Sequence, residues 1–461
     1  MSLFNEAGDI NLPPVFVCSP SLGGGGYLVS RYREMAVMAT CEEYIVRGNL
    51  IYTESMEKFS ALSDGGMVVR DGRIQSAGPY GEVADRGLPV LDYRDKLIIP
   101  GFVDLHVHAA QYHQIGMGMD ETLIRWLEKY TFAEEERFAD PEQAAVLYAD
   151  FIRELVYSGT TRAAVFATTH PVATDILCRL LKKAGVGAFV GKVNMDANAP
   201  VELQEETKTS LDQTRQFLRQ WQDDPLIRPI LTPRFAPSVT RELLAGLGEL
   251  GREYQVPVQS HLAENQEEVA WVARLFPERA SYLDVYDYYH LFGDTPTLMA
   301  HCIYLSPQDI RYMAGRNVYA VHCPDSNLNL RSGLMPARKM LRAGVRMGLG
   351  SDVGAGNSLF MPHEIVRAIE ISKIYALHHP EDDPLHLSEA FYLATKGGGS
   401  FFGQVGSLEP GYAADFLVVD VGAHQGKRSL EEQLEFFLYH GSPHNICARY
   451  AAGRSLDMST F

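Results

Sequence analysis

The chain has 461 residues, of which 46% are hydrophobic and 21% are charged. This composition is typical of a globular protein with a buried core, and it excludes a disordered, collagen-like or coiled-coil chain. The 58 acidic residues outnumber the 41 lysines and arginines, which gives a formal net charge of −17. A negative field of this kind repels phosphate backbones, so we expect no nucleic-acid partner. The length suits a large α/β barrel with an accessory module, or two to three smaller domains.

The first 35 residues are predicted to be an irregular leader. They contain Pro13-Pro14 and a glycine run at 23–26, neither of which belongs inside a regular helix or strand. Residues 1–9 carry acidic groups and lack a basic region, so we expect no secretory signal.

Two β-rich segments are predicted on either side of the central part of the chain. Within 36–97, short runs alternate apolar and polar residues, and Asp71-Gly72 supplies a tight hairpin turn. Within 406–461, residues 414–419 are strand-like. Segments that flank a domain in sequence can pair in space. We therefore predict one discontinuous module, a small β-sandwich formed by the N- and C-terminal segments.

The central segment, 98–405, repeats a strand followed by a helical pattern. The predicted strands are 98–106, 162–167, 186–194, 228–234, 257–261, 297–301, 318–322 and 345–350. Several are continuous apolar runs, as expected of strands buried on both faces. Among the helices, Asp140 is a predicted N-cap before Pro141, and Gly159 follows the last apolar position. Eight strands alternating with helices over ~250 residues predict a (β/α)8 TIM-type barrel, which would be the metal-dependent catalytic domain.

The cysteine pattern and the hydropathy suggest a compartment. No apolar run reaches the roughly 18 residues that span a bilayer, so we expect no membrane association. The six cysteines are scattered without a CxxC pair. This usage is typical of reduced thiols in a cytosolic enzyme, so we expect a cytoplasmic protein.

Metal-binding residue types end several of the predicted strands, where a barrel carries its catalytic groups. His106 and His108 are one residue apart, so both side chains leave the same face of the first strand. Two buried imidazoles are either hydrogen-bonded core histidines or ligands of a shared cation. His261 ends the fifth strand and Asp352 follows the eighth. Together these three histidines and the aspartate could form an N3O shell for one Zn²⁺ and a water, although Fe²⁺ or Mn²⁺ would also suit the set.

Three residues are candidates for catalysis. Glu264 could reach both a metal-bound water and a substrate nitrogen, as a general base that later acts as acid. Alternatively, its negative charge only stabilises the positive N-terminal end of the helix that follows. His301 ends the sixth strand, and a fifth ligand would crowd out the water. We therefore interpret it as a hydrogen-bonding partner of the attacking hydroxide, against the alternative of a histidine paired to backbone. Asp352 could also accept a proton from the water, or could simply form an Asx turn.

Substrate contacts are predicted around the same strand ends. Arg234 could donate to a carbonyl oxygen, and Phe235 could offer a ring face to a flat heterocycle. Equally, Arg234 could be a salt-bridge member and Phe235 a core residue. Gln111 could present its amide to the edge of a base or be an ordinary loop residue. His261 and Glu264 would also line the pocket.

Several longer motifs together resemble the amidohydrolase superfamily, specifically its mononuclear deaminase branch. They are PGFVDLHVHAAQY (100–112), WLEKYTFAEEERF (126–138), AFVGKVNMD (188–196), LTPRFAPS (231–238), SHLAENQEE (260–268), AHCIYL (300–305), HCPDSNLNLRSG (322–333) and GSDVGAG (350–356). The resemblance runs from about residue 41 to 455. The two narrowest motifs are those at 126–138 and 231–238.

The resemblance implies hydrolysis of guanine to xanthine and ammonia on a zinc site, in a homodimeric enzyme of purine catabolism. It implies zinc binding by His106, His108, His261 and Asp352, proton transfer by Glu264, support of the hydroxide by His301, and purine binding by Gln111, Arg234 and Phe235. Dinuclear members carry a modified lysine at the end of the fourth strand, where this chain has Arg234, so we expect one metal per subunit. The alternatives are another heterocycle (a triazine, an adenine derivative or a pterin) and a non-catalytic scaffold.

Overall fold

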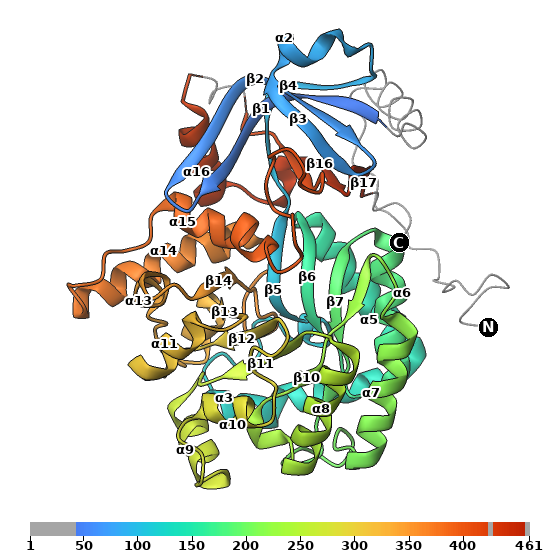
Figure 1. Ribbon diagram of the computed structural model, residues 1–461, viewed down its shortest axis with the longest axis vertical. Helices are drawn as coiled ribbons and strands as arrows, with labels where there is room; N and C mark the ends of the chain where they lie inside the picture. The colour runs from blue at the N-terminus through green and yellow to red at the C-terminus, as the bar shows by residue number, and fades with distance from the viewer. Residues whose placement is uncertain (1–42, 423–426, 457–461) are drawn as a thin grey trace, which may run out of the picture.

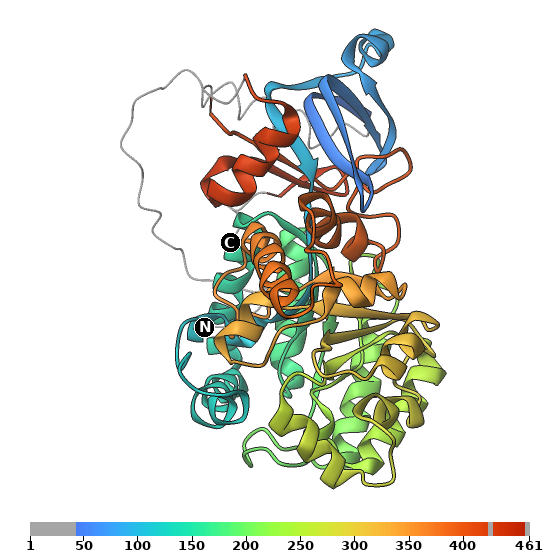
Figure 2. The ribbon, with the colours of Figure 1, turned by 90° about the vertical axis from the view of Figure 1, so that its left-hand side faces the viewer.

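The N- and C-terminal segments of the described chain form a β-rich module at one end of the molecule (Figures 1 and 2). The computed structural model describes residues 43–422 and 427–456, so the predicted leader, 1–35, lies outside it. The strands of the module are β1 (Glu43–Ser55), β2 (Lys58–Arg70), β3 (Arg73–Pro79), β4 (Val90–Pro100), β15 (Phe416–Val419), β16 (Ile446–Ala451) and β17 (Arg454–Ser455). Within the described chain they form a single sheet in the order β17-β16-β15-β4-β1-β2-β3. A sandwich of two separately hydrogen-bonded sheets is not seen there.

The local sequence explains how this sheet is assembled. Asp71 and Gly72 both have positive φ, 50° and 73°, which a type I′ hairpin turn requires, and they join β2 to β3 as the sequence predicts. The N- and C-terminal segments meet where β4 pairs antiparallel with β15, Ile98 opposite Val418. Ile98, Phe416 and Val418 then share a buried apolar cluster, which holds the two distant segments together.

The central segment contributes parallel strands, which Figure 1 shows below the module. The strands are β5 (Phe102–His108), β6 (Thr160–Phe166), β7 (Gly187–Gly191), β8 (Val193–Asn194), β9 (Ile227–Pro229), β10 (Thr232–Pro233), β11 (Val258–Leu262), β12 (Thr297–His301), β13 (Val318–His322) and β14 (Arg346–Leu349). Among the described residues, β5-β6-β7-β9 form one four-stranded sheet, β11-β12-β13-β14 a second, and β8 pairs with β10.

Backbone hydrogen bonds join the edges of the two parallel sheets. On one side, Leu231 N donates to Pro257 O at 3.0 Å and Gln259 N donates to Leu231 O at 2.8 Å. On the other, Asp352 N donates to His106 O at 2.8 Å and His108 N donates to Val353 O at 3.0 Å. Because all these strands run parallel, their carboxyl ends lie on one side of the molecule.

The predicted strands match the observed ones closely, with two differences. The first prediction, 98–106, is wrong at its start: residues up to Pro100 belong to β4 of the module, and β5 begins at Phe102. The third and fourth predicted strands are each interrupted, into β7 and β8 and into β9 and β10. The second interruption begins directly after Pro229, whose nitrogen cannot donate to a strand ladder.

Most helices cover the outside of the parallel strands, whereas α2 (Tyr80–Val83) and α16 (Leu430–His440) pack against strands of the module. The α-helices are α2 (Tyr80–Val83), α3 (Leu123–Trp126), α4 (Phe132–Glu136), α5 (Pro141–Tyr157), α6 (Pro171–Ala184), α7 (Thr207–Trp221), α8 (Arg241–Tyr254), α9 (Gln266–Leu275), α10 (Tyr282–Tyr288), α11 (Pro307–Ala314), α12 (Pro324–Asn329), α13 (Ala337–Arg342), α14 (Met361–His378), α15 (Leu387–Tyr392) and α16 (Leu430–His440). Within 43–422 and 427–456, none is both long and apolar enough to cross a membrane.

Helix α5 shows how the sequence sets these elements. The carboxylate of Asp140 accepts a hydrogen bond from Glu142 N at 2.9 Å and caps the helix, with Pro141 at its first position. Its apolar face is buried, and Gly159, with a φ of 92°, follows its end. The predicted N-cap and the predicted helix end are confirmed.

Candidate active site at the carboxyl ends of the strands

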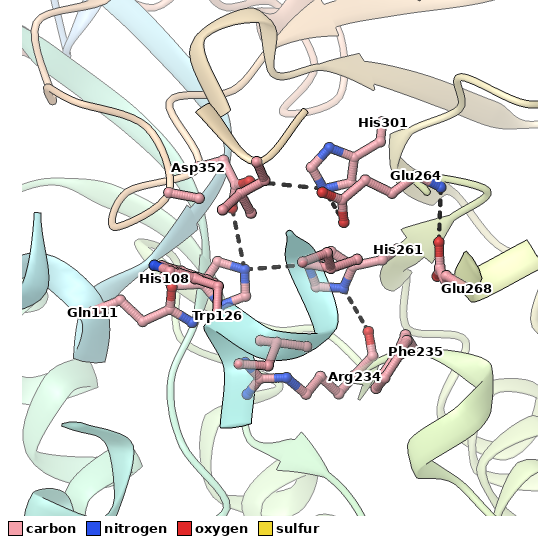
Figure 3. Close-up of a pocket in the computed structure, with 14 residues that line it drawn as sticks. His108, Gln111, Trp126, Arg234, Phe235, His261, Glu264, Glu268, His301 and Asp352 are labelled. Atoms are coloured by element: carbon pink, nitrogen blue, oxygen red, sulfur yellow. Dashed lines mark hydrogen bonds and ion pairs between the residues drawn. The ribbon is translucent and has the colours of Figure 1, made fainter. Parts of the chain in front are cut away.

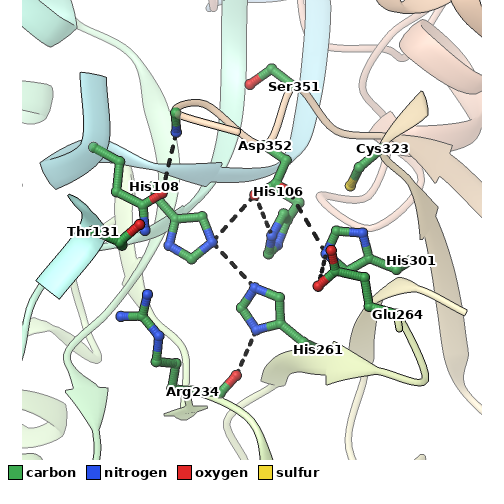
Figure 4. A network of polar contacts seen from close by, with 12 residues as sticks. His106, His108, Thr131, Arg234, His261, Glu264, His301, Cys323, Ser351 and Asp352 are labelled. Carbon is green, nitrogen blue, oxygen red and sulfur yellow. Dashed lines mark hydrogen bonds and ion pairs between the residues drawn. The ribbon is translucent and has the colours of Figure 1, made fainter. Parts of the chain in front are cut away.

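Four histidines and one aspartate from distant parts of the chain converge at the carboxyl ends of β5, β11, β12 and β14 (Figure 4). The ring nitrogens His106 Nε2 and His108 Nε2 lie 3.1 and 3.4 Å from Asp352 Oδ1. His108 Nε2 lies 3.2 Å from His261 Nε2. All five side chains are buried or nearly so, and the structure brings together the residues that the sequence analysis singled out at the strand ends.

The backbone fixes the ring of His261 in one tautomer. Its Nδ1 lies 2.6 Å from the carbonyl oxygen of Arg234. A carbonyl only accepts hydrogen bonds, so Nδ1 carries the proton and Nε2 presents its lone pair to His108. Burial lowers the pKa of both His108 and His261 below the usual histidine value, and that of His106 too. Three neutral imidazoles beside one carboxylate are a donor set that suits a divalent metal.

His301 differs from the other three. Its Nδ1 lies 2.8 Å from Asn327 Oδ1, and its Nε2 lies 3.4 Å from Glu264 Oε2 and 3.7 Å from Asp352 Oδ2. Burial opposes its charged form, yet the carboxylates of Glu264 and Asp352 raise its pKa above the usual value. A ring that favours the protonated form is better suited to donate hydrogen bonds than to bind a cation.

The loop that carries Asp352 is tied to the first strand by Asp104. This buried carboxylate accepts from Ser351 N at 3.0 Å, from Ser351 Oγ at 2.5 Å and from His106 N at 3.2 Å. It thereby fixes residues next to both His106 and Asp352. Asp104 lies in the motif at 100–112, but its position in the sequence did not predict these hydrogen bonds.

Left-handed backbone conformations gather at the same place. Ala263, His301, Cys302 and Asp352 have φ of 52°, 71°, 52° and 46°. Non-glycine residues adopt this region at a cost of roughly 1–2 kcal/mol each. Such strain is typical of functional sites, where the surrounding structure holds a side chain in a required direction.

Glu264 lies at the edge of the histidine cluster and is buried. Burial raises the pKa of Glu264 to about 7, although His301 and a hydrogen bond from Ser332 favour its charged form. Ser332 Oγ donates to Glu264 Oε1 at 2.7 Å. Glu268 holds the backbone at this turn, since its Oε2 accepts from the N–H groups of Glu264 and Asn265 at 2.9 and 3.1 Å. A carboxyl group that titrates near neutrality can both accept and donate a proton.

A pocket opens beside the cluster (Figure 3). Its polar lining combines the histidines and carboxylates with Gln111 and Arg234. Its apolar lining consists of Leu123, Trp126, Leu127, Phe235, Leu330 and Ala355. An apolar pocket with a few converging polar groups is the usual form of a site for a small aromatic molecule.

The structure places each predicted substrate residue in this pocket. Arg234 directly follows β10, Phe235 is the next residue, and Gln111 lies in the 3₁₀-helix η2 (Ala109–Gln114) after β5. Arg234 Nη1 lies 2.5 Å from Glu135 Oε2, and Gln111 Nε2 donates to Glu135 Oε1 at 2.8 Å. Arg234 is therefore a salt-bridge member, as one interpretation of the sequence predicted, and it also lines the pocket.

The donor set fits one divalent cation. Ligand atoms of His106, His261, His301 and Asp352 lie within 4.8 Å of one another, and His108 Nε2 adjoins them at the distances given above. His106 Nε2 is buried and makes no hydrogen bond of good geometry within the described residues. A buried nitrogen that has no hydrogen-bond partner and lies beside a carboxylate is suited to bind a divalent cation.

Besides Asp104, the supporting residues Trp126, Glu135 and Ser332 escaped the sequence prediction. Trp126 and Glu135 fall in the motif at 126–138, and Ser332 in the motif at 322–333. Membership of those motifs was the available signal. Their roles depend on which distant side chain each one meets, and no local spacing encodes that.

Comparison with known proteins places the chain in a family. A sequence profile described as the amidohydrolase family matches residues 97–446. The chain is 37% identical over 378 residues to the guanine deaminase of Dictyostelium discoideum, covering 80% of this chain and 84% of that protein. It is 35% identical over 408 residues to the guanine deaminase of Escherichia coli (strain K12), covering 85% and 91%.

A solved structure gives the same answer. The fold matches that of guanine deaminase from C. acetobutylicum with guanine bound in its active site, with a TM-score of 0.89 and 46% sequence identity. That match covers 90% of this chain and all of the other. The resemblance predicted from the motifs is thus confirmed. Since the family profile spans most of the chain and the relatives align over most of their length, this chain belongs to the amidohydrolase family.

Proposed function

We propose that this protein is a metal-dependent hydrolase that converts guanine and water to xanthine and ammonia. The observation that carries the proposal is the position of Glu264, a buried carboxyl with a pKa of about 7, between a metal-binding cluster and a small aromatic-lined pocket. The identity to guanine deaminases over most of the chain supports guanine as the substrate. The parallel strands and their bridged edges support a (β/α)8 barrel over about residues 98–405.

We assign His106, His108, His261 and Asp352 as the metal ligands and zinc as the metal. The tautomer of His261 and the lowered pKa values of the three histidines support this choice over a set that includes His301. When bound, a divalent ion at this site supplies an activated water near neutral pH. One metal per chain is expected, because the described strand ends place Arg234 where a bridging lysine would be needed.

Glu264 performs the proton transfers. As a carboxylate it accepts a proton from the attacking water while the oxygen adds to the ring carbon that bears the amine. It then donates that proton to the adjacent ring nitrogen. Glu264 next accepts the remaining proton of the added hydroxyl and passes it to the amine, so that the C–N bond breaks, ammonia leaves and the ring carbon becomes the second carbonyl of xanthine. His301, held through Asn327, donates to the oxygen that adds to the ring.

The pocket side chains orient the purine. Arg234 donates to the ring carbonyl oxygen and Gln111 donates to the polar edge of the base, while Phe235 and Trp126 enclose its faces. Holding a flat ring in one pose converts the encounter with water into an intramolecular reaction. The discrimination among heterocycles therefore resides in Gln111 and Arg234.

The test is ammonia release from guanine by zinc-loaded protein, compared with the Glu264→Gln variant. We expect steady turnover by the wild type and a loss of roughly 10²- to 10⁴-fold in the variant. No ammonia from guanine, with release from a triazine, an adenine derivative or a pterin, would replace guanine by that substrate. No release from any of them by metal-loaded protein would contradict an enzymatic role.

Two further parts of the proposal concern the cellular compartment and the oligomeric state. We propose a cytoplasmic homodimer, on the cysteine usage and on the resemblance to its family. Size-exclusion chromatography with light scattering tests the dimer, and a mass of one chain would contradict it.

A further inference from the structure

The buried carboxylate of Glu135 lies between the two side chains that we assign to purine recognition. Glu135 belongs to α4, and its side chain, like those of Gln111 and Arg234, is at least 97% buried. One oxygen, Oε1, accepts from Gln111 Nε2 at 2.8 Å, and the other, Oε2, accepts from Arg234 Nη1 at 2.5 Å. The three residues come from α4, η2 and the end of β10, so the carboxylate joins three separate parts of the pocket wall.

The chemistry of a carboxylate decides how Gln111 is turned. A carboxylate only accepts hydrogen bonds, so the amide nitrogen of Gln111 must face Glu135. The amide oxygen of Gln111 then accepts from Gly354 N at 3.3 Å. With its oxygen engaged on one side and one N–H engaged on the other, Gln111 keeps an N–H to offer to a ligand.

The same helix holds the guanidinium of Arg234 in a second way. The Arg234 guanidinium carbon lies 5.5 Å from the centre of the Phe132 ring, and Phe132 and Glu135 are three positions apart on α4. The guanidinium is planar with five N–H donors, so fixing one edge against Glu135 sets the direction of the others. Because Arg234 also presents its carbonyl to His261, its backbone is held independently of Glu135.

We propose that Glu135 is a positioning residue for substrate recognition, which turns the free N–H donors of Arg234 and Gln111 toward the carbonyl oxygen of the purine. This inference rests on the proposed function and adds to it a determinant of specificity that does not touch the substrate. Its consequence is selective: Glu135 matters for a purine with a ring carbonyl and has little effect on one without it.

The experiment compares guanine with 2-aminopurine, which has the same ring and reacting amine but lacks the carbonyl oxygen. The variants are Glu135→Gln, which keeps the shape but loses the charge, and Glu135→Asp, which keeps the charge on a shorter side chain. Glu136→Gln is the matched control, a half-buried carboxylate on the same helix. Melting temperatures establish first that each variant is folded. If Glu135→Gln does not fold, Glu135→Asp is compared with the wild type in its place.

We expect kcat/KM for guanine to fall roughly 10²-fold in Glu135→Gln, the usual effect of a misplaced orienting group, with 2-aminopurine changed less than about threefold. Glu135→Asp recovers part of the preference, and Glu136→Gln leaves both values unchanged. If the wild type does not turn over 2-aminopurine, its inhibition constant takes the place of kcat/KM.

An equal loss for both purines in Glu135→Gln would overturn the inference, because it would show a general structural effect. An unchanged preference for guanine would overturn it as well. Failure of the proposed function is a separate result, namely a wild-type protein that releases no ammonia from guanine. In that case the dissociation constants of the two purines, measured by calorimetry, decide the role of Glu135 by the same comparison.

Discussion

Ser332→Ala tests whether Glu264 is the base that titrates near neutrality. The Ser332 hydroxyl is buried and donates to Glu264 Oε1 at 2.7 Å, a hydrogen bond that stabilises the charged carboxylate. Hydrogen bonds to charged groups contribute about 1.5–3 kcal/mol. Since one pH unit corresponds to about 1.36 kcal/mol, the pKa of Glu264, about 7, should rise by roughly one to two pH units in the variant.

The sign of the effect on activity follows from the role of the base. Glu264 must be ionised to accept the proton of water, so kcat/KM declines as the pH falls below its pKa. A higher pKa of Glu264 moves that decline to a higher pH. At pH 7 we expect kcat/KM of the variant to be roughly 5- to 50-fold below that of the wild type. At pH 9 the two values should lie within about twofold of each other.

The assay is ammonia release at low guanine concentration between pH 5.5 and 9, expressed as the ratio of variant to wild type so that titration of the substrate cancels. The backbone at Ser332 should stay in place, since its carbonyl accepts from the Tyr304 hydroxyl at 2.5 Å. Ser372→Ala is the matched control, because Ser372 is also a buried serine but donates to Ile369 O in α14. A decline that stays at the same pH, or moves lower, would refute the assignment of Glu264 as this base.

Two further perturbations test the ligand set and the junction of the module. His108→Ala should lose stoichiometric metal after dialysis while His301→Ala keeps one ion per chain, as measured by elemental analysis; the reverse would transfer the ligand role to His301. Asp415→Ala should lower stability by roughly 3–5 kcal/mol, because it leaves the guanidinium of Arg162 buried without its carboxylate, now 2.6 Å away. Urea unfolding measures this, and a loss as small as that of Asp64→Ala, which removes an ion pair from the exposed surface, would contradict it.

Local patterns in the sequence were enough to predict most of the strand and helix order. The period of two in the strands, the N-cap at Asp140 and the turn at Asp71-Gly72 each act over a few residues, and the structure has them where they were expected. The boundary near residue 100 was wrong for a reason beyond local pattern. Residues 97–100 are equally apolar in either sheet, and it is their pairing with β1 and β15 that assigns them to the module.

The sequence by itself determined which chemistry is possible: histidines one residue apart on a strand, a glutamate three residues after a histidine, and an aspartate after the last strand. Because strands and turns have a fixed geometry, these spacings determine on which face or at which end of an element each side chain lies. The tertiary structure decided which partner each group meets. Glu135 lies 99 residues from Arg234 and Ser332 lies 68 residues from Glu264. Such pairs depend on how helices pack around the strands, so the direction of a guanidinium and the pKa of a buried carboxyl are properties of the assembled fold.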